Sequence, residues 1–257
     1  MIDLTQIYRH SLQAQPYGWA AIGNLFSPED AADLAASFPR EHFKTLLYYG
    51  ERDYEYEARA LIGMGADTVS HPEELSEAWL DLARDLLSRP YRIAMSLLTG
   101  RDLINAPLEV NVFHYGPGAN LGPHPDLDDK LVTHILYFNQ SWNREDGGCF
   151  NILRSADPAD VAAEVEPIVG NSAVVVRSEK SWHSVSRVVN GCLRSRRSLT
   201  ATFYREGSVS TMWPPGDTTP LHRYDATDLG PEIHRPTTLW TKWRRRFASR
   251  TPQLSSI

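Results

Sequence analysis

The sequence predicts an α+β protein with a mainly β core, preceded by helices and followed by a long extension. Residues 1–105 carry helix-start signals and apolar residues at helical spacing, whereas residues 106–206 hold six short apolar runs separated by Gly, Pro, Asn and Asp. Residues 207–257 are rich in Pro, Thr and Trp. Six strands in about 100 residues, with turns between them, are typical of a sandwich or barrel. We expect one domain, 1–257, in which a helical region and a wrapping segment pack on the β core.

Three helices are predicted before the β core. The first begins at Ser27, a good N-cap, because Pro28 and two acidic residues follow it. The second begins after Pro72, and the third covers residues 91–98 and stops at Gly100. The second helix has an apolar stripe at spacings of four, three and four, formed by Leu75, Trp79, Leu82 and Leu86.

Successive residues of a predicted strand point to opposite faces, so the position of polar and apolar residues indicates which face is buried in the body of the domain. The predicted strands are LEVNVFHY, KLVTHILYFN, CFNILR, NSAVVVR, SVSRVV and RRSLTATFY. In the last run, one face is polar (Arg196, Ser198, Thr200 and Thr202) and the other is mostly apolar (Arg197, Leu199, Ala201 and Phe203). A polar face on a strand within the fold indicates a pocket. After the strands we expect a short helix near Trp240–Phe247.

A candidate metal site combines His124-Pro125-Asp126, in a Gly- and Pro-rich segment, with His183 further along the chain. Two histidines and one carboxylate form the facial triad of iron(II) oxygenases, which leaves three positions open. A structural zinc site would favour thiolates and a closed shell. This pattern therefore favours iron(II) over zinc.

A candidate anion site lies on the polar face of the last strand. Arg196 precedes Ser198 by two residues, so a guanidinium fork and a hydroxyl can hold one carboxylate. We prefer Arg196 to its neighbours Arg194 and Arg197. In the strand before the metal pair, Tyr115 shares a face with Glu109, and its hydroxyl is expected in the same pocket.

Residues 107–206 resemble the double-stranded β-helix (jelly-roll) core of the 2-oxoglutarate/iron(II)-dependent dioxygenases. Within them the chain is similar to the prolyl-hydroxylase-like branch, which is related to amino-acid hydroxylases and halogenases. The order and spacing of five segments carry the resemblance: NVFHYGPGANLGPHPD, VTHILYFNQSW, DGGCFNIL, GNSAVVVRSEKSWHSV and RRSLTATFY.

The resemblance implies that His124, Asp126 and His183 bind iron(II). It implies that Arg196 binds the far carboxylate of the co-substrate 2-oxoglutarate, with help from Ser198 and Tyr115, and that dioxygen is the oxidant. Some relatives carry a tyrosine at the position of Leu136, whereas here the tyrosine is Tyr137. Related halogenases replace the carboxylate ligand by a small residue. Because this chain keeps Asp126, we expect hydroxylation.

The expected substrate is a small polar molecule, either a free amino acid or a natural-product intermediate. Candidate substrate contacts are Arg59, Glu109, Trp142 and Trp213, since an arginine and a carboxylate together suit an amino acid. One alternative is hydroxylation of a protein or peptide side chain. Others are a jelly-roll that binds a metal or ligand without catalysis, and a cupin-like metalloenzyme that does not use 2-oxoglutarate.

The composition of the chain argues against some classes of binding partner. The net charge of −6 argues against a nucleic-acid partner, and the basic run Arg244–Arg246 is interpreted as a solvated helix face. Two cysteines do not form a disulfide framework. We see no secretion signal and no apolar run long enough to span a bilayer, so we expect a cytoplasmic protein without a membrane partner. The sequence does not specify an oligomeric state.

Overall fold

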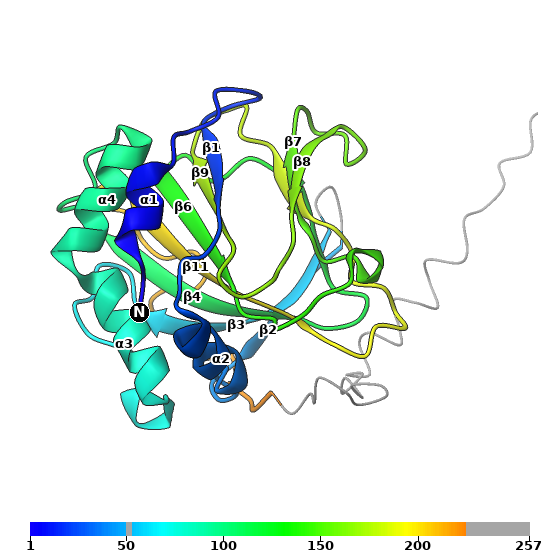
Figure 1. The fold of residues 1–257 in the computed structure, drawn as a ribbon. Helices are drawn as coiled ribbons and strands as arrows, with labels where there is room; N and C mark the ends of the chain where they lie inside the picture. The colour runs from blue at the N-terminus through cyan, green and yellow to red at the C-terminus, as the bar shows by residue number, and fades with distance from the viewer. Residues whose placement is uncertain (50–52, 225–257) are drawn as a thin grey trace, which may run out of the picture.

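The computed structural model describes residues 1–49 and 53–224 (Figure 1). Its helices are α1 (Leu4–Arg9), α2 (Pro28–Ala36), α3 (Glu77–Leu87) and α4 (Arg89–Thr99). Two one-turn 3₁₀ helices span Pro72–Glu74 and Arg144–Asp146. The strands are β1 (Trp19–Ile22), β2 (Lys44–Tyr48), β3 (Tyr54–Ile62), β4 (Leu108–Tyr115), β5 (Asn120–His124), β6 (Lys130–Tyr137), β7 (Phe150–Leu153), β8 (Val161–Val165), β9 (Ser172–Val176), β10 (His183–Val185) and β11 (Arg196–Tyr204).

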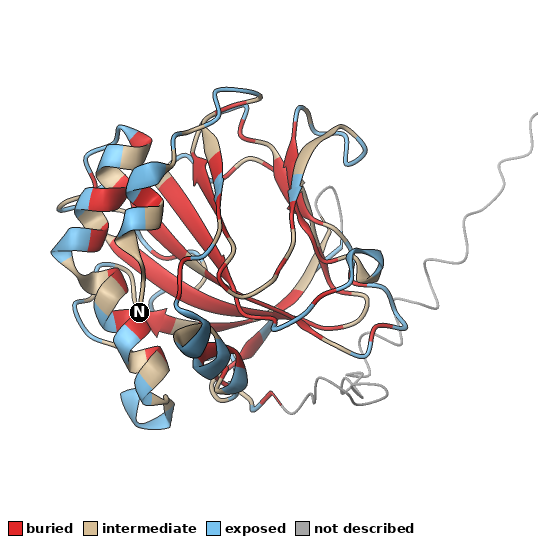
Figure 2. Ribbon diagram, viewed as in Figure 1, coloured by how far each residue is buried: buried red, intermediate tan, exposed pale blue. Residues whose placement is uncertain are grey.

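The strands form one antiparallel sheet that curls into an open barrel. The predicted jelly-roll fold is therefore confirmed. The strand order of the sheet is β1-β9-β6-β11-β4-β3-β5-β10-β7-β8, and β2 pairs with β3. Figure 1 shows α1, α3 and α4 grouped on one outer side of the barrel, with α2 at its lower end. In Figure 2 the strands are largely buried, whereas the outward faces of these helices are exposed.

The sheet separates two apolar cores. The outer core lies between the helices and the sheet and includes Trp79, Leu199, Ala201 and Phe203. The barrel core fills the interior and includes Phe113, Tyr115, Ile135 and Tyr137. Strand alternation assigns the residues to these cores. The predicted division of the last strand is confirmed, because its apolar face packs outward and its polar face points into the barrel.

The predicted helices correspond to α2, α3 and α4, including the caps Ser27 and Gly100. The predicted start of the second helix after Pro72 is too early, because Pro72–Glu74 form a separate 3₁₀ turn and α3 begins at Glu77, which leaves Leu75 outside it. Strands β4 and β11 have the predicted bounds LEVNVFHY and RRSLTATFY. The prediction of a mainly helical region before residue 105 is wrong in one respect, since this region also supplies β1, β2 and β3 to the sheet. Strand β10 is much shorter than the predicted run, and β5 and β8 were not predicted. The helix expected near Trp240–Phe247 lies outside the described residues.

Among residues 1–49 and 53–224, no helix combines the length and the apolar composition that a membrane crossing requires.

Candidate active site

The three predicted metal ligands meet at one point inside the barrel. His124 ends β5, Asp126 follows it in the next turn, and His183 begins β10. Strands β5 and β10 are paired so that His183 lies opposite His124. One ligand atom from each of the three side chains lies within 4.8 Å of the others, and all three residues are buried. The antiparallel pairing therefore brings together residues that are far apart in the sequence.

The two imidazoles are oriented by hydrogen bonds from their Nδ1 atoms. His124 Nδ1 donates to the carbonyl oxygen of Gly122, and His183 Nδ1 donates to that of Ser181, both at 2.8 Å. Because a carbonyl can only accept, each ring carries a proton on Nδ1, which leaves Nε2 as the atom that could bind a metal ion. The ring centroids are 4.3 Å apart. This arrangement is typical of two histidines that share a metal ion.

The Asp126 carboxylate is held by two donors. Lys130 Nζ lies 2.6 Å from Oδ1, and the Thr133 hydroxyl donates to Oδ2 at 2.9 Å. Burial alone would raise the pKa of Asp126, but the charges of Lys130, His183 and His124 hold that pKa well below its ordinary value. A buried carboxylate beside two imidazoles, without thiolates, is a donor set that fits iron(II).

Arg196 lies inside the same barrel and is almost fully buried, with 1% of its surface exposed. Its Nε donates to the Gly148 carbonyl and one Nη to the Ser198 hydroxyl, each at 2.7 Å. The guanidinium packs 4.8 Å from the ring centre of Tyr115 and 5.3 Å from that of Tyr137. In the part of the chain that the structure describes, no carboxylate pairs with it. A buried cation without an anion indicates a binding site for one.

Tyr137, which stands one position after the tyrosine of some relatives, is a pocket residue. It lies opposite Ser198 in the β6–β11 pairing, so its ring points into the barrel, whereas Leu136 belongs to the outer core. Burial raises the pKa of Tyr137 and keeps its hydroxyl protonated. This hydroxyl is buried and has no hydrogen-bond partner among the described residues. Strand pairing, rather than the position of the tyrosine in relatives, would have identified it.

A glycine makes room for the buried arginine. Gly148 adopts φ +70°, and a Cβ there would lie 3.1 Å from Trp142 Cζ2 and 3.4 Å from Arg196 Cδ. Trp142 therefore packs beside Arg196, and its Nε1 donates to the Gly147 carbonyl at 2.7 Å. This places Trp142 next to the predicted anion site, although the sequence analysis treated it as a substrate contact.

Glu109 and Trp213, two candidate substrate contacts, lie on the interior side of the barrel. Tyr204 donates its hydroxyl to Glu109 Oε2 at 3.2 Å, while Glu109 Oε1 is buried without a partner among the residues described. Trp213 Nε1 donates to Asn111 Oδ1 at 2.7 Å. Lys44 packs 4.1 Å from the Trp213 ring. Lys44 went unnoticed in the sequence because β2 was not predicted.

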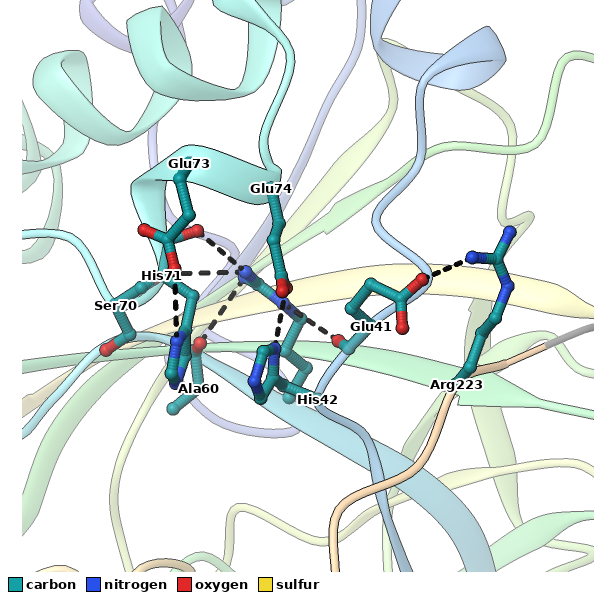
Figure 3. Close-up of polar contacts among 9 residues, drawn as sticks. Glu41, His42, Ala60, Ser70, His71, Glu73, Glu74 and Arg223 are labelled. Atoms are coloured by element: carbon teal, nitrogen blue, oxygen red, sulfur yellow. Dashed lines mark hydrogen bonds and ion pairs between the residues drawn. The ribbon is translucent and has the colours of Figure 1, made fainter.

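Arg59 faces away from the barrel interior, which argues against its predicted role as a substrate contact. In β3 it lies opposite Val112 of the outer core, whereas the preceding Ala58 lies opposite Phe113 of the barrel core. Its guanidinium donates at 3.1–3.4 Å to four backbone carbonyls, those of Glu41, Ala60, Ser70 and His71. Figure 3 shows this polar cluster, in which Ala60 belongs to β3 and Glu73 and Glu74 to the 3₁₀ helix. Arg59 thus ties two loops to β3.

Comparisons with known proteins agree with this geometry. Residues 110–205 match the family model of the 2OG-Fe(II) oxygenase superfamily, whose members use iron(II), 2-oxoglutarate and dioxygen. These residues contain the three clustered ligands and Arg196. A comparison with curated proteins gives no match.

Solved structures share the fold. A prolyl-4-hydroxylase from Pseudomonas putida has a TM-score of 0.53 and 22% identity, covering 79% of this chain and 98% of that one. An oxidoreductase of the 2OG-Fe(II) oxygenase family from Burkholderia pseudomallei has a TM-score of 0.54 and 15% identity, with coverages of 79% and 91%. A Trichoplax adhaerens prolyl hydroxylase, solved with a peptide fragment, has a TM-score of 0.50 and 17% identity, with coverages of 79% and 89%. Residues 110–205 therefore form a 2OG-Fe(II) oxygenase domain, and the chain has the fold seen in these prolyl hydroxylases.

Proposed function

We propose that His124, Asp126 and His183 bind iron(II), and that Arg196 binds the far carboxylate of 2-oxoglutarate with help from Ser198 and Tyr115. The observation that carries this proposal is the pairing of a buried facial cluster with a buried, anion-free arginine in one barrel interior. Iron and 2-oxoglutarate together supply the oxidising chemistry by which dioxygen hydroxylates a C–H bond.

The chain's own residues position the reactants and exclude water. Arg196 and Ser198 provide a charged fork and a hydroxyl for one carboxylate, and the unpartnered hydroxyl of Tyr137 can donate to the same group. Thr133 and Lys130 fix the orientation of the Asp126 carboxylate. The apolar barrel core around these groups limits access of water, which strengthens each electrostatic contact.

The proposed substrate is a small polar molecule, such as a free amino acid or a natural-product intermediate. Glu109 supports this choice, because its buried Oε1 has no partner among the described residues and suits a substrate ammonium group. Trp213, hydrogen-bonded to Asn111 on the same face, would cover the bound molecule. With Arg59 turned outward, its proposed part in holding the substrate carboxylate is withdrawn.

Succinate release tests the proposal directly. The iron(II)-loaded protein would receive 2-oxoglutarate and air, with a panel of free amino acids, small metabolites and proline-containing peptides. Stimulation by an amino acid is the expected result, and stimulation by peptides alone would favour the alternative of a peptide hydroxylase. Failure of 2-oxoglutarate to bind or to turn over would refute the proposal.

The single-domain organisation and the cytoplasmic location remain predictions. Limited proteolysis tests the first, since a single domain should resist cleavage between residues 105 and 107. Cell fractionation tests the second.

A further inference from the structure

A row of four tyrosines runs from the surface to the proposed co-substrate pocket. Tyr48 on β2 stacks on Tyr54 of β3, with ring centroids 5.7 Å apart and an interplanar angle of 26°. Tyr54 lies 5.5 Å from Tyr56, and Tyr56 lies 5.3 Å from Tyr115 of β4. The last ring packs 4.8 Å from the Arg196 guanidinium. We call these four residues the tyrosine row.

Exposure changes along the tyrosine row from one end to the other. Tyr48 is 50% exposed, Tyr56 is 9% exposed and Tyr115 is 3% exposed. The row therefore connects solvent to the barrel interior without a break. The nearby Phe113 packs at 71° to Tyr56, a T-shaped contact beside the row. Aromatic packing alone would be served equally by phenylalanine, whereas a phenol can also give up an electron and a proton.

The chemistry of the enzyme creates a need for such a path. Reduction of dioxygen takes four electrons, of which 2-oxoglutarate supplies two through its oxidative decarboxylation and the substrate supplies two. When no substrate is bound, the missing two electrons must come from another donor. Side chains that line the pocket are the nearest donors, and their oxidation would damage the site.

We propose that the tyrosine row carries oxidising equivalents from the co-substrate pocket to the surface when turnover occurs without substrate. This inference rests on the proposed function. At the outer end, Tyr48 and Tyr54 each lose one electron and one proton, and a carbon–carbon bond forms between their rings. The reaction balances: dioxygen, 2-oxoglutarate and two tyrosines give succinate, carbon dioxide, water and one dityrosine.

The pairing of β2 with β3 favours this end point. Tyr48 and Tyr54 are directly opposed across the two strands, and opposed residues on one face of an antiparallel pair lie close enough for their side chains to interact. Tyr49, the next residue, donates its hydroxyl to Glu55 Oε2 at 2.9 Å. This bond lies on the other face of the hairpin, so it leaves the Tyr48–Tyr54 ring contact unchanged.

The test uses the iron(II)-loaded full-length protein with 2-oxoglutarate and air but without substrate. Succinate is quantified, and the digested protein is searched by mass spectrometry for a Tyr48–Tyr54 cross-link. The critical variant is Tyr56→Phe, which keeps the ring and interrupts the row. We expect succinate release to continue, the cross-link to be lost and oxidation to appear at pocket residues. Tyr56→Trp, which restores an oxidisable ring, should restore the cross-link.

Tyr8→Phe is the matched control, because Tyr8 is 51% exposed on α1 and lies outside the row. It should leave the cross-link yield unchanged. Succinate release without oxidation of Tyr48 or Tyr54 would overturn the inference while leaving the proposed function intact. An equal cross-link yield in the wild type and Tyr56→Phe would also overturn it. Absence of succinate in this substrate-free assay would overturn the inference alone, since the row would then have no oxidising equivalent to carry; the proposed function is tested separately by 2-oxoglutarate binding and by substrate-stimulated succinate release.

Discussion

His134 is a buried histidine that should limit the stability of the fold in acid. It lies on β6 beneath α4, is fully buried, and has its Nδ1 2.9 Å from the Tyr91 hydroxyl. Its Nε2 has no hydrogen-bond partner within the described part of the chain. Burial lowers the pKa of His134 from 6.5 to about 3. The folded protein therefore keeps this ring neutral at a pH where the unfolded chain protonates it.

The direction and size of the change in unfolding free energy follow from the difference between the folded-state and unfolded-state pKa of His134. Because the folded-state pKa is depressed, the stability contributed by neutral His134 is present above about pH 6.5 and decreases as the pH falls towards 3. One pKa unit corresponds to about 1.4 kcal/mol, so lowering the pH to about 5 should cost about 2 kcal/mol of unfolding free energy through this residue alone.

Denaturant unfolding of the metal-free protein at about pH 8 and pH 5 measures this effect. The matched variant is His134→Gln, which keeps a polar group near Tyr91 and cannot titrate. We expect the wild type to lose about 2 kcal/mol more than the variant between the two pH values, since all other titrating groups are shared. An equal loss in the two proteins would refute the assignment of acid sensitivity to His134.

Four further predictions concern the site and the core. Asp126→Ala should weaken iron binding on the order of tenfold or more with unchanged circular dichroism, and unchanged iron affinity would exclude this carboxylate as a ligand. Arg196→Ala should raise the KM for 2-oxoglutarate on the order of tenfold or more, because a hydrogen bond to a charged group contributes about 1.5–3 kcal/mol; a larger effect of Arg197→Ala would mean that the wrong face was assigned. Gly148→Ala should raise the same KM and destabilise the fold by about 1 kcal/mol, since φ is +70° there and Arg196 is in contact; wild-type values in both assays would contradict this. Trp79→Ala, at a fully buried outer-core position, should cost about 3–5 kcal/mol in denaturant unfolding, and a cost below about 1 kcal/mol would contradict the packing described.

The local sequence was sufficient to predict an element where its residues alternate clearly between polar and apolar, or where its ends carry typical capping residues. Strand β11 alternates polar and apolar residues from Ser198 to Phe203, so both its bounds and its inward face could be predicted. The cluster of His124, Asp126 and His183 could be predicted from the types of these residues and their order in the chain. The caps Ser27 and Gly100 mark helix ends through backbone hydrogen bonding and a left-handed conformation, both local properties.

Local signals failed where pairing with a distant strand decides the structure. Strand β5 contains Gly122 and Pro123, which are typical of a loop, and it is a strand because β3 and β10 pair with it. Strand β3 falls in the region predicted to be mainly helical, yet it lies between β4 and β5 in the sheet. Strand propensity depends on such partners more than helix propensity does. The outward direction of Arg59 follows from the register between β3 and β4, which no single segment encodes.

Three buried cationic side chains differ in the groups that contact them, and this difference distinguishes structural residues from a candidate ligand-binding residue. Arg59 is satisfied by four backbone carbonyls, and Lys44 pairs with Asp217 at 2.5 Å. Arg196 is equally buried, but across residues 1–49 and 53–224 no carboxylate neutralises it. Because a buried charge without a counter-ion is unfavourable, an anion bound beside Arg196, as proposed, would stabilise this site. The sequence contains many arginines, and their environments in the folded chain distinguish Arg196 as the candidate for binding an anion.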